Sequence, residues 1–309
     1  MKKLLPIGFS MVIVLCVGFV VVQKKSEQPL AVKATTQELG LGEFKPKRSC
    51  ARLPKFLKRM HITQPVMIDL SQKRFKGIAL YHGQKLQKVL HPKMWEKYEH
   101  FSTYALDKEG NIFLAPSPFI SIRANTFALQ TNIYKLDSKT GKIERFMHLK
   151  DVHPSAQNPY GINALVYDCD DETLWVSAID ETSYDKQRGT IYHIDIKTKK
   201  ILQKLEGLDA LSLALVRSEK EKHLLVGGSR KSVLYAYQIV KNRAKNRAKT
   251  LLTLPNANEF IRKIKVKAKN TLELQTIPFM YSLITQTAKK DRKYYLTAWD
   301  EKLKSWVFK

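Results

Sequence analysis

The feature of this sequence that most constrains its fold is a repeated series of short strands and turns. In its clearest copy, an apolar strand at residues 101–106 leads through a turn at 107–110 to a second strand at 111–115, and further strands flank a turn at 138–141. Gly and Asp mark these turns, as tight hairpins require. Copies open near residues 101, 162, 211 and 260. A strand-built period of roughly 50–60 residues is typical of propeller blades with long loops.

The later copies become less regular along the chain. The second copy, at 162–205, follows the first closely, and the third runs from 211 to 238. The fourth copy is degraded, and the strands after it are clear but out of step, at 281–287, 293–299 and 305–308. Three strands also precede the first copy, at 66–70, 75–81 and 85–90.

The strands at both ends of the repeat region predict how the ring closes. We expect the three upstream strands to complete a blade with the C-terminal strands, because closure removes the exposed edges of a linear stack. The sequence therefore predicts an all-β fold, a β-propeller of five or six four-stranded blades, preceded by one N-terminal transmembrane helix. An open β-sandwich or a seven-bladed ring remains the alternative.

The N-terminus predicts the membrane helix. Residues 4–22 contain no charged side chain and lie between Lys2-Lys3 and Lys24-Lys25. At 1.5 Å per residue, about 19 residues span roughly the 30 Å of a bilayer core. A cleaved signal peptide is the alternative, although the nearest small-x-small site ends only at Ala34, and Leu15 before Cys16 disfavours a lipoprotein.

The same segment predicts domain organisation and location. We expect a signal-anchor at residues 1–25, a linker at 26–56 and the propeller domain at 57–309. The lysines on the two sides of the apolar run carry nearly equal positive charge, so the positive-inside rule gives no clear orientation. We therefore base the orientation on the resemblance of the segment's layout to a signal sequence. It predicts a single-pass membrane protein with its N-terminus inside and the propeller exported, either periplasmic or extracellular.

The charge of the chain indicates what kind of partner it could bind. The formal net charge of +26 favours anionic partners such as lipid headgroups or acidic glycans.

The cysteines leave their pairing open. Cys50 and Cys169 either pair in an oxidising compartment or remain two separate thiols. The chain has no C-x-x-C and no H-E-x-x-H motif, so the usual spacing for a zinc or iron–sulfur site is missing.

The repeat resembles the NHL-repeat and gluconolactonase-like (senescence marker protein) propellers. The likeness rests on residues 107–115 and 168–177 and on the strand-Asp phrases at Asp137 and Asp195. Lactonases of that group bind a divalent metal through Glu, Asn and Asp at the inner mouth of the ring. The resemblance implies that Asn163 and Asp209 hold the metal. Leu211-Ser212-Leu213 replaces the S-D-G-type motif of those enzymes, and no Glu partner can be assigned.

Polar residues that enter the second and third inner strands form a candidate site at the mouth of the ring. The candidate ligand or metal residues are His153, Asn158, Tyr160, Asn163, Asp209 and Ser212. Ordinary inter-blade loops remain the alternative, because loops are polar by default. The acidic turn Asp168, Asp170, Asp171 and Glu172 resembles a calcium cluster, but it lacks the Gly and Glu spacing of an EF-hand, and a solvated turn is the commoner explanation.

A basic run in the third and fourth units forms a second candidate surface, for anionic lipid headgroups. Its residues are Lys241, Arg243, Lys245, Arg247, Lys249, Lys263, Lys265 and Lys267. A solvated loop and strand face is the alternative. Nucleic acid is a weaker candidate partner, because no aromatic residues that would stack on bases are interleaved with the run.

These patterns favour a non-enzymatic, membrane-tethered binding or scaffold module for a protein or an envelope component. No catalytic residue is predicted, since neither a G-x-S-x-G elbow nor a phosphate-binding loop occurs. The alternative is a divergent lactonase-like hydrolase with a divalent cation (Ca, Zn or Mn). The sequence leaves the ligand, the partner and the oligomeric state open.

Overall fold

The computed structural model describes residues 40–46, 50–70, 75–98, 100–117, 126–155, 158–180, 182, 186–281 and 292–309. The predicted signal-anchor and its membrane orientation lie outside these residues. Among the described residues no helix has both the length and the apolar character needed to cross a bilayer.

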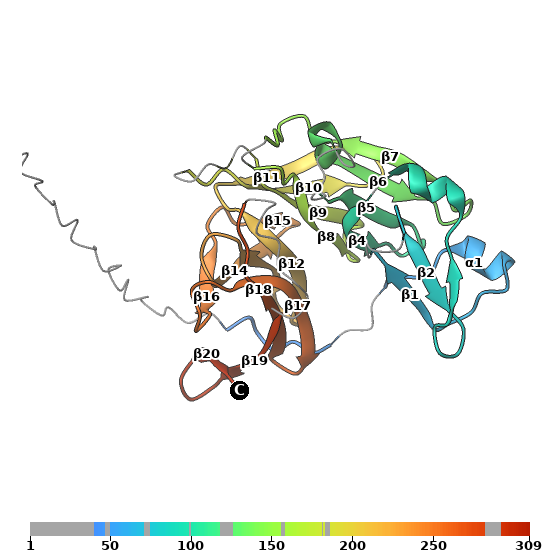
Figure 1. The fold of residues 1–309 in the computed structure, drawn as a ribbon. Coiled ribbons are helices and arrows are strands. Elements are labelled where there is room, and N and C mark those ends of the chain that lie inside the picture. Colours follow the sequence, from blue (N-terminus) through green and yellow to red (C-terminus); the bar gives the residue numbers. More distant parts are fainter. Residues whose placement is uncertain are drawn as a thin grey trace, which may run out of the picture. The chain divides into compact units, whose positions relative to one another are not determined.

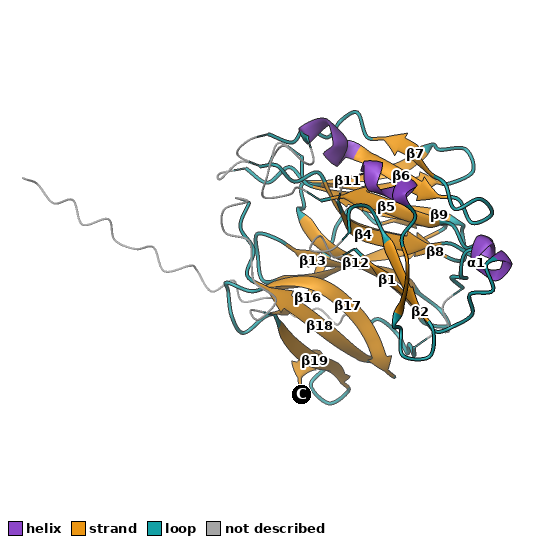
Figure 2. Cartoon of the chain, turned by 45° about the vertical axis from the view of Figure 1, so that its right-hand side comes forward, coloured by secondary structure: helices purple, strands orange, loops and turns teal. Residues whose placement is uncertain are grey.

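Antiparallel strands dominate the described residues and form five sheets, numbered here as blades 1 to 5 (Figures 1 and 2). Blade 1 contains β1 (Val66–Asp69), β2 (Ala79–His82) and β3 (Lys88–Leu90). Blade 2 contains β4 (Phe101–Leu106), β5 (Ile112–Pro116), β6 (Asn132–Leu136) and β7 (Ile143–His148). Blade 3 contains β8 (Ile162–Asp168), β9 (Thr173–Ala178), β10 (Thr190–Asp195) and β11 (Ile201–Glu206). Blade 4 contains β12 (Ala210–Arg217), β13 (Lys222–Gly228), β14 (Val233–Val240), β15 (Arg243–Ala244) and β16 (Lys249–Thr253). Blade 5 contains β17 (Phe260–Ala268), β18 (Thr271–Ile277), β19 (Lys293–Asp300) and β20 (Ser305–Phe308).

The helices among the described residues are short. α1 (Lys55–Arg59) precedes blade 1, the 3₁₀ segment η1 (Lys93–Tyr98) connects blades 1 and 2, and the 3₁₀ segment η2 (Phe127–Thr131) lies between β5 and β6 of blade 2. The predicted all-β propeller is confirmed, with five blades in the described residues.

The predicted closure of the ring by a shared blade is wrong. In the described residues β1 to β3 pair only with one another, and β17 to β20 form a sheet of their own. The last strand instead completes a local hairpin, in which Trp299 faces Trp306 across β19 and β20. A hairpin brings its strands together at a much smaller loss of chain entropy than a pairing across the whole chain.

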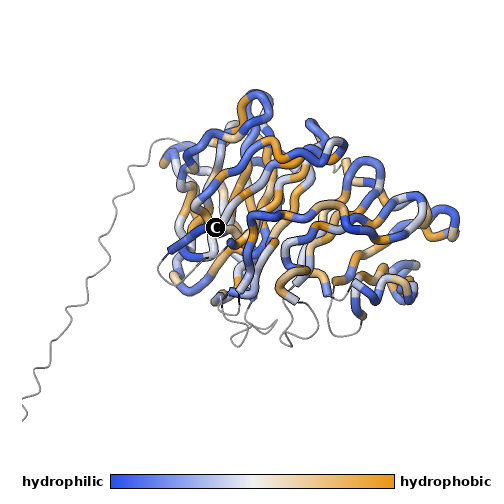
Figure 3. Tube along the Cα trace, turned by 90° about the horizontal axis from the view of Figure 1, so that it is seen from above, coloured by the Kyte–Doolittle hydropathy of each residue, from blue (hydrophilic) through white to orange (hydrophobic). Residues whose placement is uncertain are grey.

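Burial follows the stacking of the blades. Every residue of the second strands β5, β9 and β13 is buried, whereas the outer strand β11 is mostly exposed. A sheet covered on both faces loses its alternating polarity in this way. Apolar residues follow the strands and polar residues the turns (Figure 3).

Four hydrophobic clusters in the described residues each join two consecutive blades. Phe101 and Leu80 belong to the cluster between blades 1 and 2, and Phe113 and Leu174 to the next. The remaining two clusters join blade 3 to blade 4 and blade 4 to blade 5. None of the four joins blade 5 to blade 1, so apolar packing runs along the chain order.

The segment predicted as the end of a linker packs against the blades. Residues 40–46 and 50–56, here called the strap, run along the turns of several blades and appear as the blue stretch of Figure 1. Leu41 and Phe44 are buried in the cluster between blades 4 and 5. Gly42 has φ +67°, and a Cβ there would lie 2.6 Å from the Ser218 hydroxyl oxygen, so only glycine fits this close approach.

Hydrogen bonds also tie the strap to blades 5 and 2. Phe44 N donates to the side-chain Oδ1 of Asn270, in the turn of blade 5, and Asn270 N donates to the Phe44 carbonyl, both at 3.0 Å. Arg52 N donates to the Asp107 carbonyl (3.2 Å), and Phe56 N donates to the Ser138 carbonyl (2.8 Å). Both acceptors lie in turns of blade 2.

A disulfide fixes the middle of the strap. Cys50 is bonded to Cys169 in the first turn of blade 3, across a sequence separation of 119 residues. The pairing that the sequence left open is therefore formed. Residues 40–46 and 50–56, which belong to the predicted linker, therefore pack against the blades.

Candidate functional site

The antiparallel connections divide the loops between two ends of the blades. Turns between the first and second strands and between the third and fourth strands of blades 2 to 5 lie at the end that the strap crosses, here called the strap face. The segments that lead into each first strand, and those that link the second strand to the third, lie at the opposite end. This opposite end is here called the mouth face, and it carries the predicted mouth residues.

An arginine joins the first strands of four blades. Register shifts occur at the start of β4, β8, β12 and β17, at Ser102, Asn163, Leu211 and Arg262. The Arg262 guanidinium donates hydrogen bonds to the carbonyls of the other three, at 3.3, 3.4 and 3.0 Å respectively. Burial lowers the pKa of Arg262, and Arg292 adds to the effect. Arg262 directly precedes Lys263 of the predicted basic run, and an alignment of the four first strands would have distinguished it from the lysines.

Asp209 forms the centre of a second polar network, on the mouth face. Its side chain is fully buried. One carboxylate oxygen accepts hydrogen bonds from Gly189 N (2.6 Å) and Thr182 Oγ1 (2.8 Å), and the other accepts one from the Tyr281 hydroxyl (2.6 Å). Arg230 Nε lies 3.8 Å from the same oxygen as Tyr281. The network thus links blades 3, 4 and 5.

Burial raises the pKa of Asp209 above its usual range, although Tyr281, Thr182 and Gly189 oppose the shift. Burial and the neighbouring Asp209 also raise the pKa of Tyr281. A Cβ at Gly189 would come within 2.4 Å of the Asp209 carboxylate, so the site requires glycine there. Asp209 is buried, and both of its carboxylate oxygens accept hydrogen bonds from the described residues, so this carboxylate positions the loops around it.

Half-buried aromatic rings lie beside this network. Phe279 contacts Tyr160 (5.2 Å between ring centroids), Tyr281 (5.3 Å) and Phe260 (6.4 Å) in tilted or edge arrangements. The Arg230 guanidinium lies 5.6 Å from the centre of the Tyr281 ring. Aromatic and arginine side chains of this kind are enriched in protein-binding surfaces. This group is here called the aromatic rim.

The other predicted mouth residues have structural partners. His153 N and Nδ1 lie 2.7 and 3.2 Å from Asp180 Oδ1. Asn158 is buried and donates to the Thr182 carbonyl (3.4 Å). Ser212 Oγ donates to the Ile261 carbonyl across blades 4 and 5 (2.7 Å). Of the six predicted residues, the structure connects Asn158 to the Asp209 network through Thr182 and places Tyr160 in the aromatic rim.

The residues proposed to hold a metal have other partners. Asn163 Nδ2 donates to the Gly161 carbonyl (3.1 Å), and both oxygens of Asp209 accept the hydrogen bonds given above. No group of three or more His, Cys, Asp or Glu side chains in the described parts of the chain is placed to hold a metal ion. The geometry of the described residues therefore gives no support to the implied lactonase metal set.

The acidic turn of blade 3 is neutralised by cations. Lys222, on β13, lies 2.5 Å from Asp168, 2.6 Å from Asp171 and 3.8 Å from Asp170. Arg217 also pairs with Asp170. These carboxylates are bound by side chains of the next blade, which differs from the solvated turn expected from the sequence.

The two parts of the predicted basic surface differ. The cations in the loop after β14 and on its flanking strands are exposed, and none of them forms a salt bridge among the described residues. These cations are Lys241, Arg243, Lys245, Arg247 and Lys249. On β17, Lys265 and Lys267 pair with Glu273 of β18, at 3.7 and 3.3 Å. Lys263 is also exposed over part of its surface. Burial of the remainder lowers its pKa, and the positive charges of Arg262 and Arg292 add to the effect.

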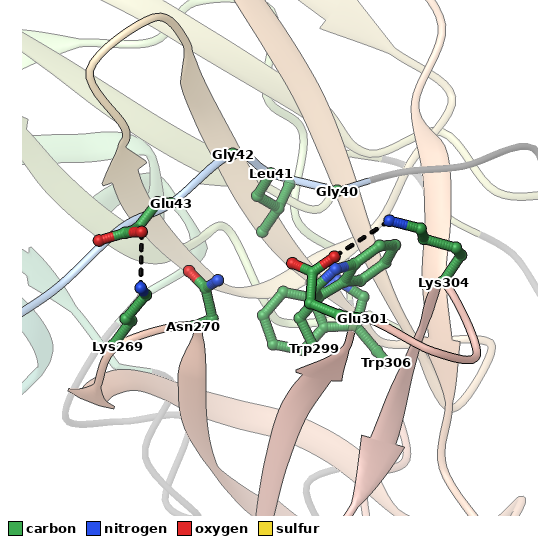
Figure 4. A pocket seen from close by; sticks show the side chains of 10 residues that line it. All are labelled: Gly40, Leu41, Gly42, Glu43, Lys269, Asn270, Trp299, Glu301, Lys304 and Trp306. Carbon is green, nitrogen blue, oxygen red and sulfur yellow. Dashed lines mark hydrogen bonds and ion pairs between the residues drawn. The ribbon is translucent and has the colours of Figure 1, made fainter.

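A cavity of about 660 Å³ lies on the strap face between the strap and blade 5 (Figure 4). Sequence reasoning did not detect it, because its walls come from opposite ends of the chain. Trp299 and Trp306 form one wall, with ring centroids 6.2 Å apart. Glu43 pairs with Lys269 (2.6 Å), and Glu301 pairs with Lys304 (3.1 Å).

Comparisons with known proteins give a fold likeness alone. No protein-family model matches the chain, and no curated protein matches it. A structure of a nidogen/laminin complex is similar at 12% identity and a TM-score of 0.46, covering 80% of this chain and 75% of that one. The extracellular domain of a putative one-component system from B. thetaiotaomicron is similar at 11% identity and a TM-score of 0.43, covering 75% and 25%.

Likenesses at this level say nothing about function. The propeller part of the resemblance seen in the sequence is confirmed by the five sheets. The NHL-repeat and gluconolactonase-like families are not named by any of these comparisons.

Proposed function

We propose that this protein is a membrane-tethered, exported β-propeller that acts as a non-enzymatic binding module. Its ligand is a protein or another envelope component, which docks on the mouth face. The proposal joins the apolar N-terminal segment at residues 4–22 to the surface chemistry of the propeller.

The observation that carries the proposal is the contrast between the buried Asp209 network and the aromatic rim beside it. Asp209 has no exposed surface, and both of its carboxylate oxygens accept hydrogen bonds. The aromatic rim beside it is half-exposed and includes Tyr160, Phe279 and Tyr281. Rigid aromatic rings next to an arginine suit molecular recognition, whereas a sealed carboxylate does not suit proton transfer to a substrate.

The disulfide supports the exported location. Disulfides persist in oxidising compartments and are rare in the cytosol. The bond between Cys50 and Cys169 joins both cysteines that lie outside the apolar N-terminal segment.

The exposed basic run supports an additional contact with anionic lipid or glycan. Five cations between Lys241 and Lys249 stand in solvent within one loop and its flanking strands. Each cation near an anionic surface contributes up to about 1 kcal/mol of binding free energy.

The experiment compares full-length protein in detergent with the double variant Tyr160→Ala, Phe279→Ala for retention of a partner from an envelope extract. We expect the double variant to lose a partner that the wild type retains. Tyr294→Ala, which removes an exposed ring from blade 5, is the matched control and should retain it. Equal loss in the control would show that the mouth face is not the docking surface.

A second assay separates binding from catalysis. Lactone and ester substrates are incubated with the metal-replete protein, with and without chelator. We expect no metal-dependent turnover. Turnover that requires metal and disappears in Asp209→Asn would establish the hydrolase alternative.

A further inference from the structure

We propose that the propeller docks on the anionic lipid headgroups of its own membrane through a basic hollow on the strap face. The cations of this hollow belong to residues 241–249, here called the basic loop, and Gly40 of the strap borders it. The inference rests on the membrane tether of the proposed function and names the partner of its basic surface.

Strand pairing holds the basic loop in place on blade 4. β15 and β16 both pair with β14, so the loop is fixed at both ends. Lys245 N donates to the Gln238 carbonyl (2.8 Å), and Lys249 lies opposite Ala236. The side chains of Lys245, Arg247 and Lys249 all line the same hollow, which has a volume of about 110 Å³. The backbone therefore brings three cations together at one place.

The lining carries more positive than negative charge. Lys245, Arg247 and Lys249 form no salt bridge among the described residues. Glu221 is the carboxylate among the described lining residues, and it accepts a hydrogen bond from Gln238 Nε2 (3.1 Å). Because the carboxylate is held by Gln238, the three cations remain available to an anion from outside. Phosphate oxygens accept charge-assisted hydrogen bonds from such groups.

The buried His223 also borders the hollow and shows that the cations converge there. Burial lowers the pKa of His223, and the positive charges of Lys249 and Lys245 add to the effect, although Glu221 opposes it. Two cations that act on one imidazole also repel each other. An anionic headgroup in the hollow would relieve that repulsion.

Exposed aliphatic side chains flank the basic loop. Val240 is exposed at its start, and Ile201 and Leu202 are exposed on β11 of blade 3. Gln203 and Ala244 exchange two hydrogen bonds, at 2.7 and 2.9 Å, which join β11 to the basic loop. Cations beside exposed aliphatic groups suit the interface of a lipid bilayer. A soluble acidic glycan offers nothing for the aliphatic groups to contact.

The length of the preceding chain keeps this surface close to the membrane. Gly40 borders the hollow, and the 17 residues 23–39 separate it from the apolar segment at 4–22. A chain of that length reaches at most about 60 Å when extended, and as a flexible coil its ends lie about 20–25 Å apart on average. The tether thus gives the headgroups a high effective concentration at the hollow.

Docking through the strap face has a consequence for the mouth face. The two faces lie at opposite ends of the blades. A propeller that rests on the bilayer with its basic loop therefore presents the aromatic rim away from the membrane, where a partner can reach it.

The test uses the full-length protein in bilayer nanodiscs of phosphatidylcholine alone or of equimolar phosphatidylcholine and phosphatidylglycerol. Trace acetylation with acetic anhydride, read by mass spectrometry, gives the reaction rate of each lysine. We expect phosphatidylglycerol to slow the acetylation of Lys245 and Lys249 at least about threefold. Lys231, an exposed lysine in the mouth-face loop between β13 and β14, is the internal control and should react at the same rate in both discs.

A variant then tests the electrostatic contact while both reporter lysines stay in place. We expect Arg247→Gln to lower the equilibrium constant of docking about fivefold, because one cation near the surface is removed. Arg145→Gln removes the same charge from an exposed position on β7 of blade 2 and should leave docking unchanged. High salt should abolish the protection of Lys245 and Lys249.

Three results would overturn the proposal. The first is equal acetylation of Lys245 and Lys249 in the two discs, and the second is equal protection of Lys231. The third is protection by polygalacturonate in phosphatidylcholine discs without protection by phosphatidylglycerol, because this would assign the hollow to an acidic glycan.

These results are separate from the test of the mouth face. Each of the three leaves the mouth-face proposal intact, since that proposal is tested with the variants of Tyr160 and Phe279. Failure of the full-length protein to enter the nanodiscs would instead contradict the tether, and the docking proposal would fall with it.

Discussion

On the strap face, residues 40–46 and 50–56 bond to the turns of several blades, whereas the described loops of the mouth face bond to neighbouring loops. The strap reaches Asn270 of blade 5, Cys169 of blade 3 and Asp107 of blade 2. The mouth network spans blades 3 to 5 through the short side chains around Asp209. Contacts between residues far apart in the sequence are concentrated on the strap face, and exposed aromatic surface is concentrated on the mouth face.

This difference explains how the propeller is held without a shared blade. In the described residues no hydrophobic cluster joins blades 5 and 1. The strap provides a connection across the turns instead. We therefore expect changes on the strap face and at Arg262 to cost stability, and changes at the aromatic rim to cost binding.

Loss of the disulfide should have the largest effect. Cross-linking residues 119 apart restricts the unfolded chain, and we expect Cys50→Ser to lower the free energy of unfolding by about 4 kcal/mol. Urea denaturation measures this change. Cys169→Ser should cost the same, and the double variant no more. A loss below about 1 kcal/mol would mean that the strap contributes little to stability.

Removal of the central guanidinium should come next. Arg262→Met leaves three carbonyls of blades 2, 3 and 4 without this donor, and we expect a loss of about 3 kcal/mol in the free energy of unfolding. Lys263→Met, a change at the exposed neighbouring residue, is the control. Similar losses in the two variants would argue against the specific role of Arg262.

A pH titration tests the contribution of a buried histidine in blade 3 to stability. His193 is fully buried against Trp175, and burial lowers its pKa to about 4 from 6.5. The unfolded chain therefore binds the proton first as pH falls. Stability present above pH 6.5 should decline toward pH 4, by up to about 3 kcal/mol.

The variant His193→Phe, which keeps a ring against Trp175, should flatten that decline in urea denaturation series. His223→Phe should remove a further part, because burial also lowers the pKa of His223. An unchanged pH slope in His193→Phe would show that its titration does not control acid stability.

The aromatic rim should give the smallest stability change. Tyr160→Ala removes a half-buried ring, and we expect thermal and urea unfolding to report a loss of about 1 kcal/mol or less. A loss as large as that of Cys50→Ser would make the rim a structural element and would erase the distinction between the two faces.

The repeat predicted the middle blades well. The predicted strand at 101–106 coincides with β4, and β8, β9 and β10 lie within the predicted second copy at 162–205. Contacts within the turn stabilise the connection between β4 and β5, because the Asp107 carboxylate accepts hydrogen bonds from the N–H groups of Glu109 and Asn111. Blade 1 was not recognised as a separate blade, because its three short strands do not carry the full repeat.

The candidate site was predicted only in part. The polar residues before the inner strands predicted Tyr160 and Asp209 at the mouth. The family resemblance implied a metal-binding role for Asp209, which its internal hydrogen bonds do not support. Arg230 and Tyr281 were missed, because neither belongs to a motif. They become partners of Asp209 only when the loops of blades 4 and 5 come together.

The sequence by itself determined the strands, the turns and the repeat, since alternation and turn chemistry act over a few residues. It could not determine the partner of Cys50, the three carbonyl acceptors of Arg262 or the cavity between the strap and blade 5. Cys50 and Cys169 are 119 residues apart, and Ser102 and Arg262 are 160 apart. Only the packing of whole blades brings such groups within bonding distance, because no local rule of the chain specifies contacts across that separation.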